Sequence, residues 1–156
     1  MKKAFLPFLP FFLSAQALLA ATPGLYPKSS LTPGVVAPVT QAQVLKVGFT
    51  KDARHVTDTT KWEVLVRYKL AKGKLDHVKL SALLKQFEID HFISLELGGA
   101  NDAANLWPEY PPTPNPKDKV ENALHAAVCD GRVKLTAAQN AIASNWQTAE
   151  QVLGLS

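Results

Sequence analysis

The sequence has a single cysteine, Cys129, among its 156 residues. One cysteine cannot form a disulfide within the chain, so the fold must be stabilised by its core, by a partner or by a bound metal ion. The paired Cys-x-x-Cys spacing that holds structural zinc is absent as well. We therefore expect neither an internal disulfide nor a structural zinc site.

The apolar run near the start of the chain is short for a membrane-spanning helix. It covers Ala4–Leu13 and is interrupted by Pro7 and Pro10. Two lysines precede this run and small residues follow it, which is the layout of a secretory signal peptide. We expect residues 1–21 to be removed on export, leaving a secreted or periplasmic protein without a membrane attachment. The alternative is a retained membrane anchor.

The excess of positive charge is small. The chain carries 17 Lys and Arg against 13 Asp and Glu, and removing the two lysines of the signal peptide leaves a net charge of +2. This value alone does not indicate nucleic acid binding. The charge is unevenly distributed, because residues 46–85 carry a net +6 and residues 86–130 a net −6. Such halves would suit a polyanion held against a metal centre, although charge alone favours two solvated faces.

The first half of the chain contains a proline-rich segment followed by the start of a predicted domain. Residues 22–43 are rich in proline and indicate an extended arm, whereas residues 44–156 are expected to form one domain. Within it, Val44–Phe49 is predicted as a short strand. Trp62–Tyr68 alternates apolar and polar residues and is predicted as a second strand. Leu75–Gln86 is compatible with a helix or with irregular structure.

A hairpin is predicted in the middle of the chain. Glu88–Leu97 is rich in large apolar residues and is closed by the turn sequence at residues 98–102. A short return strand follows at Asn105–Trp107 and stops at Pro108. The hairpin therefore has a long turn.

Two helices are predicted after the hairpin. The first begins at the N-cap Asn115 and runs to about Cys129, before Gly131. The second begins at Thr136, where Thr136–Gln139 matches a capping box, and should bury Ile142 and Trp146. On the first helix, one stripe is expected to face the core and another to face a site. The core stripe comprises Val120, Leu124, Ala127 and Val128, and the polar stripe Asp118, Glu121, Asn122 and His125.

The order of these motifs resembles the HNH (His-Me finger, ββα-metal) endonucleases. The resemblance rests on Asp90-His91, Gly98-Gly99, the Asn-Leu-Trp-Pro sequence at residues 105–108, and Lys-Asp-x-x-Glu-Asn at residues 117–122. It is similar in particular to small exported bacterial HNH-like proteins, over about residues 44–146. The resemblance implies an α+β fold with a ββα-metal hairpin–helix core, additional short strands and a C-terminal helix. Such proteins often carry a second cysteine where this chain has Leu45.

The resemblance also implies roles for individual residues. His91 would be the general base, Asp90 a ligand of one divalent metal ion, and Asn105 a brace across the hairpin loop that orients His91. The remaining metal ligands are favoured as Glu121 and His125, with Asp118 and Asn115 preceding them. The metal would be magnesium, manganese, nickel or zinc.

Two requirements accompany this assignment. Neighbouring residues of a regular strand point to opposite faces, so Asp90 and His91 can share a site only at a bulge or at a strand end. Phosphates of the substrate would need cationic contacts, for which Arg54, Lys117 and Lys119 are predicted.

Two functions remain open from the sequence. The first is a divalent-metal-dependent endonuclease that hydrolyses phosphodiester bonds of DNA or RNA with low sequence specificity, since no recognition helix is visible. It would act as a monomer on a nucleic acid substrate, and the sequence does not indicate whether an immunity protein exists. The second is a non-catalytic exported binding or envelope protein on a degenerate HNH scaffold.

Overall fold

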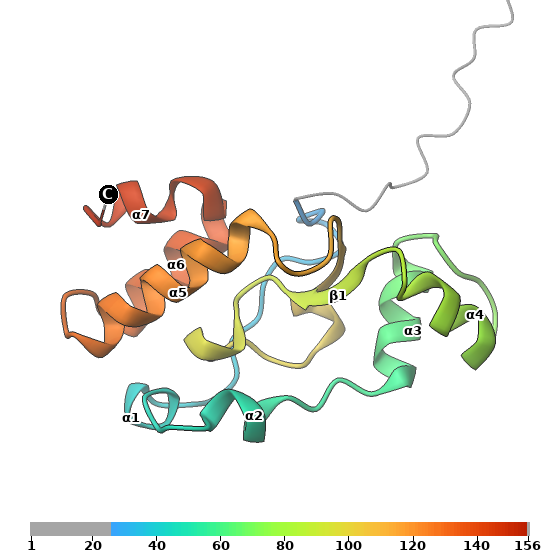
Figure 1. Ribbon diagram of the computed structural model, residues 1–156, viewed down its shortest axis with the longest axis horizontal. Helices are drawn as coiled ribbons and strands as arrows, with labels where there is room; N and C mark the ends of the chain where they lie inside the picture. The colour runs from blue at the N-terminus through green and yellow to red at the C-terminus, as the bar shows by residue number, and fades with distance from the viewer. Residues whose placement is uncertain (1–25, 156) are drawn as a thin grey trace, which may run out of the picture.

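The computed structural model describes residues 26–155, and the signal peptide expected at residues 1–21 lies outside them. The fold is α+β, with short helices surrounding one two-stranded sheet in the described part (Figure 1). None of its helices is long and apolar enough to cross a membrane. The elements are α1 (Gln41–Val44), α2 (Phe49–Ala53), α3 (Asp58–Arg67), α4 (His77–Leu83), β1 (Glu88–His91), β2 (Leu106–Glu109), α5 (Pro116–Cys129), α6 (Leu135–Asn145) and α7 (Ala149–Val152), with 3₁₀ turns at Leu95–Leu97, Ala103–Asn105 and Trp146–Thr148.

The predicted strand at residues 62–68 is wrong, because this segment lies within helix α3 and its C-cap. The Thr57 side chain caps the helix by accepting a hydrogen bond from the Thr60 backbone. Trp62, Leu65 and Tyr68 are all buried, and they follow one another at steps of three residues. Trp62 and Tyr68 thus fit one face of a helix as well as one face of a strand, whereas Leu65 joins them only in the helix. Without the cap the two patterns are hard to separate.

The predicted strand Val44–Phe49 is also wrong. Val44 ends helix α1 and Phe49 begins helix α2, with Gly48 between the two helices at a φ of 84°. Thr40 and Gln43 form a capping box that starts α1. Leu75–Gln86, which the sequence left open between a helix and irregular structure, contains helix α4.

The hairpin is confirmed, but its strands differ from the prediction. β1 ends at His91 instead of Leu97, and β2 continues through Pro108 to Glu109. In the antiparallel register, His91 lies opposite Leu106, and Ile89 opposite Pro108. Phe92 donates its backbone N–H to the Asn105 carbonyl, and hydrogen-bonded pairs alternate along such a ladder. The position of Pro108 therefore needs no donor toward β1, so proline can stand within this strand.

Helix α5 begins and ends as predicted. Asn115 accepts a hydrogen bond from the Lys117 backbone at 2.8 Å, and Asp118 returns the contact by accepting from the Asn115 backbone at 2.9 Å. Pro116 occupies the first helical position. The predicted core stripe is buried at all four positions: Val120, Leu124, Ala127 and Val128.

Helix α6 starts one residue earlier than predicted, at Leu135. Thr136 therefore lies inside the helix, and the predicted capping box is wrong. Gln139 instead donates a hydrogen bond to the Leu97 carbonyl at 2.8 Å, which ties α6 to the loop of the hairpin. Ile142 and Trp146 are buried as predicted.

Two hydrophobic clusters lie on either side of the hairpin. One joins α5, α6 and α7 and includes Leu97, whereas the other joins α3 and α4 to the strands and includes Trp107 (Figure 1). The segment at residues 26–40 forms no helix and runs along both. It pairs with the hairpin loop through an isolated bridge between Val36 and Gly99. The hairpin therefore connects two separately packed halves.

Candidate functional site

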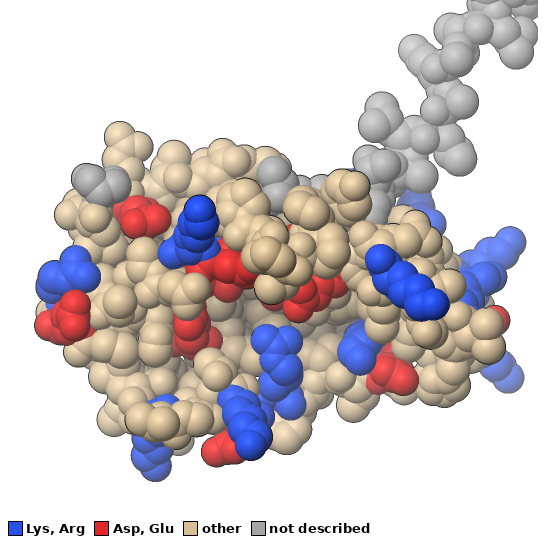
Figure 2. All heavy atoms as spheres, in the orientation of Figure 1, with Lys and Arg blue, Asp and Glu red and all other residues tan. Residues whose placement is uncertain are grey.

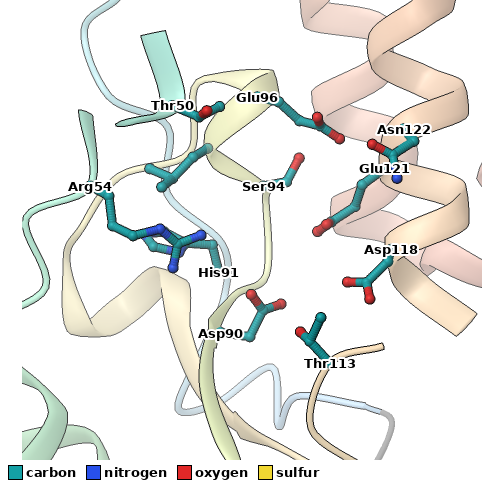
Figure 3. A pocket seen from close by; sticks show the side chains of 11 residues that line it. Thr50, Arg54, Asp90, His91, Ser94, Glu96, Thr113, Asp118, Glu121 and Asn122 are labelled. Carbon is teal, nitrogen blue, oxygen red and sulfur yellow. The ribbon is translucent and has the colours of Figure 1, made fainter. Parts of the chain in front are cut away.

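A cleft of about 380 Å³ opens between the end of β1 and helix α5. Figure 3 shows Arg54 and His91 on one wall and the α5 side chains Asp118 and Glu121 on the other, with Asp90 between them. In Figure 2, acidic side chains gather in the hollow at the centre of this face, and Lys and Arg side chains stand around its rim. The cleft is thus acidic inside and basic at its edge.

Asp90 and His91 both line this cleft although they are neighbours in sequence. β1 ends at His91, so the two side chains are not held on opposite faces of a continuing strand. The requirement for a strand end at this point is therefore met. The imidazole of His91 is buried, whereas the carboxylate of Asp90 keeps 15% of its surface exposed.

The two ring nitrogens of His91 have different surroundings. Nε2 lies 3.0 Å from Oδ1 of Asn101, whose own Nδ2 donates to the Ala53 carbonyl at 2.7 Å. Since the second contact fixes the amide orientation, Oδ1 is an acceptor and Nε2 must carry the proton. Nδ1 is buried and has no hydrogen-bond partner among the described residues. Its lone pair is thus not used in a hydrogen bond within this part of the chain, and His91 itself lines the cleft.

The protonation state of His91 follows from its environment. Burial is the largest influence and lowers the pKa of His91, and Arg54 and Lys117 act in the same direction. The hydrogen bond to Asn101 and the charge of Asp90 oppose them only in part. A neutral imidazole at neutral pH is the form that can accept a proton.

Asn105 braces the loop of the hairpin as expected. It is fully buried, and its Oδ1 accepts hydrogen bonds from the backbones of Ile93 at 3.0 Å and Val35 at 3.2 Å. Its Nδ2 donates to the carbonyls of Ile93 and Ala100, both at 3.0 Å. The bracing is confirmed, and its effect on His91 remains a prediction.

Lys117 does not reach the surface, so its predicted contact with phosphate is wrong. Only 1% of its side chain is exposed. Its Nζ donates to Oδ2 of Asp90 at 2.6 Å, to the His91 carbonyl at 2.8 Å and to Oε1 of Glu121. Burial by itself lowers the pKa of Lys117, but the charges of Asp90 and Glu121 outweigh it and raise the pKa above its usual value. The ammonium is therefore charged, and all three of its donors are used.

The other carboxyl groups of the cleft differ in their pKa values and in their contacts. Burial, opposed by Lys117 and reinforced by Asp90, raises the pKa of Glu121 to about 8. Burial also raises the pKa of Glu96, one of whose oxygens lies 3.8 Å from Nδ1 of His125. Asp118 lines the cleft while capping the start of α5.

His125 does not join Asp90 in the cleft. It pairs with Glu96, and its Nε2 lies 3.6 Å from the sulfur of Cys129, which is a free, exposed thiol. Within residues 26–155, no three His, Cys, Asp or Glu side chains are placed so as to hold a metal ion. The oxygens of Asp90 and Glu121 suit a hard cation, but Lys117 already donates to both. As placed, these residues do not fit a divalent ion.

The remaining predicted phosphate contacts are exposed. Arg54 lies at the end of α2 and lines both this cleft and a second one of about 390 Å³ that also includes Lys61. Lys119 is exposed on α5 and does not line the cleft. Of these two residues, only Arg54 lines the cleft.

Three residues that sequence reasoning did not single out belong to the site or its support. Asn101 holds His91. Ser94 lines the cleft, and its buried hydroxyl has no partner within residues 26–155. Glu109 is a fully buried carboxyl beneath the start of α5. Asn101 was visible only as part of a turn. No local pattern distinguishes it from other turn residues.

Comparison of the chain with protein-family models, with curated proteins and with solved structures finds no match.

Proposed function

We propose that this protein is an exported, monomeric endonuclease that hydrolyses phosphodiester bonds of DNA or RNA, with His91 as its general base. The observation that carries the proposal is the placement of the His91 ring. The ring belongs to a residue that lines the cleft, its Nε2–H is held by Asn101, and its Nδ1 has no hydrogen-bond partner among residues 26–155. An imidazole so fixed is a base with one defined direction of proton transfer.

The described residues suggest how the other parts of the reaction are supplied. A water molecule in the cleft would pass its proton to Nδ1 of His91 and attack the phosphorus atom. Arg54 would neutralise charge on the phosphate from the same wall. Glu121 stands on the opposite wall, where the ammonium of Lys117 donates to its carboxylate. The leaving oxygen would take its proton from water in the cleft.

The order of elements supports the same proposal. β1, β2 and α5 follow one another in the chain, and the cleft lies between β1 and α5. This is the arrangement that the resemblance to ββα-metal nucleases implies. The divalent ion implied by that resemblance is assigned no step here, because Lys117 holds the oxygens of Asp90 and Glu121.

A second candidate function is a non-catalytic binding protein on this scaffold. The observation that favours it is the charge inside the cleft, where carboxylates from Asp90, Glu96, Asp118 and Glu121 outnumber the cations. Such a surface repels a polyanion unless it is neutralised. The two candidates differ in whether the cleft cleaves nucleic acid.

Plasmid nicking and RNA cleavage by the purified protein test the proposal. We expect the wild type to cut, and His91→Ala to lose about 100- to 10,000-fold in rate, as for a missing general base. His77→Ala, which alters an exposed histidine away from the cleft, should cut as the wild type does. The assays are run with chelator and with each of magnesium, manganese, nickel and zinc.

Two results would reject the nuclease. One is a His91→Ala variant that cuts as fast as the wild type. The other is a folded wild type that cuts neither DNA nor RNA under any of these conditions, which would leave the non-catalytic candidate.

A further inference from the structure

We propose that Lys117 is a built-in cation that stands between Asp90 and Glu121 in place of a divalent metal ion and excludes such an ion from these carboxylates. Its Nζ lies among three oxygens that come from two parts of the fold. Asp90 Oδ2 and the His91 carbonyl belong to β1, and Glu121 Oε1 belongs to α5. The ammonium thus joins the strand to the helix, as a metal ion would.

The bonding capacity of the ammonium matches its surroundings. A lysine has three N–H donors, and here each has one oxygen acceptor. These are carboxylate and carbonyl oxygens, the ligands that hard divalent ions also take. An ion bound to Asp90 and Glu121 would therefore compete with Nζ for the same atoms.

The charge of Lys117 lies in the interior of the protein. Its side chain is 1% exposed, so an ammonium displaced from Asp90 and Glu121 would lose both partners while still buried, or would have to leave the interior. A buried charge without a partner is strongly unfavourable. Binding of a divalent ion would thus have to offset the displacement of the lysine.

The start of helix α5 fixes where the lysine points. Asn115 caps the helix and accepts the backbone N–H of Lys117, and Pro116 precedes it at the first helical position. Glu121 follows Lys117 by four residues, so the two side chains lie on one face of the helix. The helix cap therefore aims Nζ at Asp90 instead of at solvent.

Titration of manganese in the absence of substrate tests the proposal independently of any cleavage assay. For the wild type we expect no stoichiometric Mn²⁺ binding by calorimetry up to millimolar concentration, and the same melting temperature in Mn²⁺ and in EDTA. Lys117→Met keeps most of the apolar stem and removes the charge. It should melt lower than the wild type in EDTA and regain stability in Mn²⁺, with at least a tenfold gain in Mn²⁺ affinity.

Two further variants control this result. Lys119→Met alters an exposed lysine of the same helix and should behave as the wild type does. Asp90→Asn in the Lys117→Met background should remove the Mn²⁺ binding that the single variant gained. Lys117→Gln serves as a second neutral variant if Lys117→Met does not fold.

The proposal is overturned if the wild type binds one Mn²⁺ per chain and Asp90→Asn abolishes that binding. It is also overturned if a folded neutral variant at position 117 binds Mn²⁺ no better than the wild type. Both readouts are made without nucleic acid, so a failure of the nuclease proposal leaves them unchanged.

Discussion

At the scale of single residues, Asn101 decides which nitrogen of His91 carries the proton. Its amide accepts from Nε2 and is itself held by the Ala53 carbonyl, so the imidazole has one tautomer and one orientation. Asn101 does not line the cleft and acts through His91. It is therefore a positioning residue.

Replacing Asn101 by Leu should release this constraint. We expect cleavage to slow by about 10- to 100-fold through kcat, with little change in KM, because the base is misoriented while the cleft persists. Nitrogen NMR of the His91 ring should change from the Nε2-protonated form to a mixture of tautomers. Asn140→Leu, at an exposed position of α6, is the control. An unchanged ring spectrum in Asn101→Leu would contradict the positioning role.

The residue scale also shows where sequence reasoning stops. Asp90, His91 and Asn105 were found from their motif, and the structure brings Asp90 and His91 to one cleft with Asn105 beneath the loop. Lys117 was predicted to contact a substrate phosphate, which would require its ammonium to reach the surface. Its burial depends on Asp90, which lies 27 residues earlier in the sequence. A local pattern carries no information on such a contact.

At the scale of elements, the accuracy of the prediction followed the local signals. α5 was placed to the residue because its cap, its proline and its apolar stripe all lie within the helix itself. α3 was mistaken for a strand because apolar or aromatic residues recur at positions 62, 64, 66 and 68, although the helix buries Leu65 and exposes Val66. The remaining difference is tertiary: β1 stops at His91, where the loop braced by Asn105 begins.

The junction of β2 and α5 contains a buried acid whose titration should affect stability. Glu109 is fully buried, accepts a hydrogen bond from Asn115 through Oε2 at 2.8 Å, and has no partner for Oε1 among the described residues. Burial, with a contribution from the charge of Asp90, raises the pKa of Glu109 to about 8. The folded protein therefore binds this proton more tightly than the unfolded chain does.

Stability should accordingly fall as the pH rises from about 4.5 to about 8. The contribution of the protonated Glu109 is complete below the usual pKa of 4.5 and is lost as the pH passes the folded value, at about 1.4 kcal/mol per pKa unit. Glu109→Gln keeps the shape without the titration. In urea unfolding at pH 5, 7 and 9, Glu109→Gln should lose less stability than the wild type as the pH rises. The control Glu63→Gln, at an exposed position of α3, should lose as much stability as the wild type does. Parallel pH profiles for Glu109→Gln and the wild type would contradict this account.

At the scale of the whole molecule, the segment at residues 26–40 is bonded to several elements of the fold. Thr32 is fully buried and donates its hydroxyl to the Leu106 carbonyl at 2.9 Å. The hydroxyl oxygen of Tyr68 lies 2.8 Å from Oγ1 of Thr32 and accepts a hydrogen bond from the Lys28 backbone N–H at 3.1 Å. One threonine thus joins the segment to both α3 and β2.

Thr32→Val should therefore lower the free energy of unfolding by about 1–3 kcal/mol, because it removes a buried hydroxyl and leaves two partners unpaired. Urea unfolding is the measurement. Thr59→Val, at an exposed position of α3, is the matched control and should change stability by less than about 0.5 kcal/mol. Equal stability of the two variants would show that the segment is not held by Thr32.

The placement of this segment also sets the order in which the chain can fold. Its partners lie far along the sequence: Tyr68 and Leu106 bond to Thr32, Asn105 to Val35, and the ring of Trp146 stacks on Tyr26 at 5.9 Å between centroids. A chain that emerges from its amino end presents this segment early and the tryptophan late. Contacts across such separations close slowly. The first described part of the chain is therefore among the last to complete its contacts, because Tyr26 can stack only after residue 146 has been synthesised.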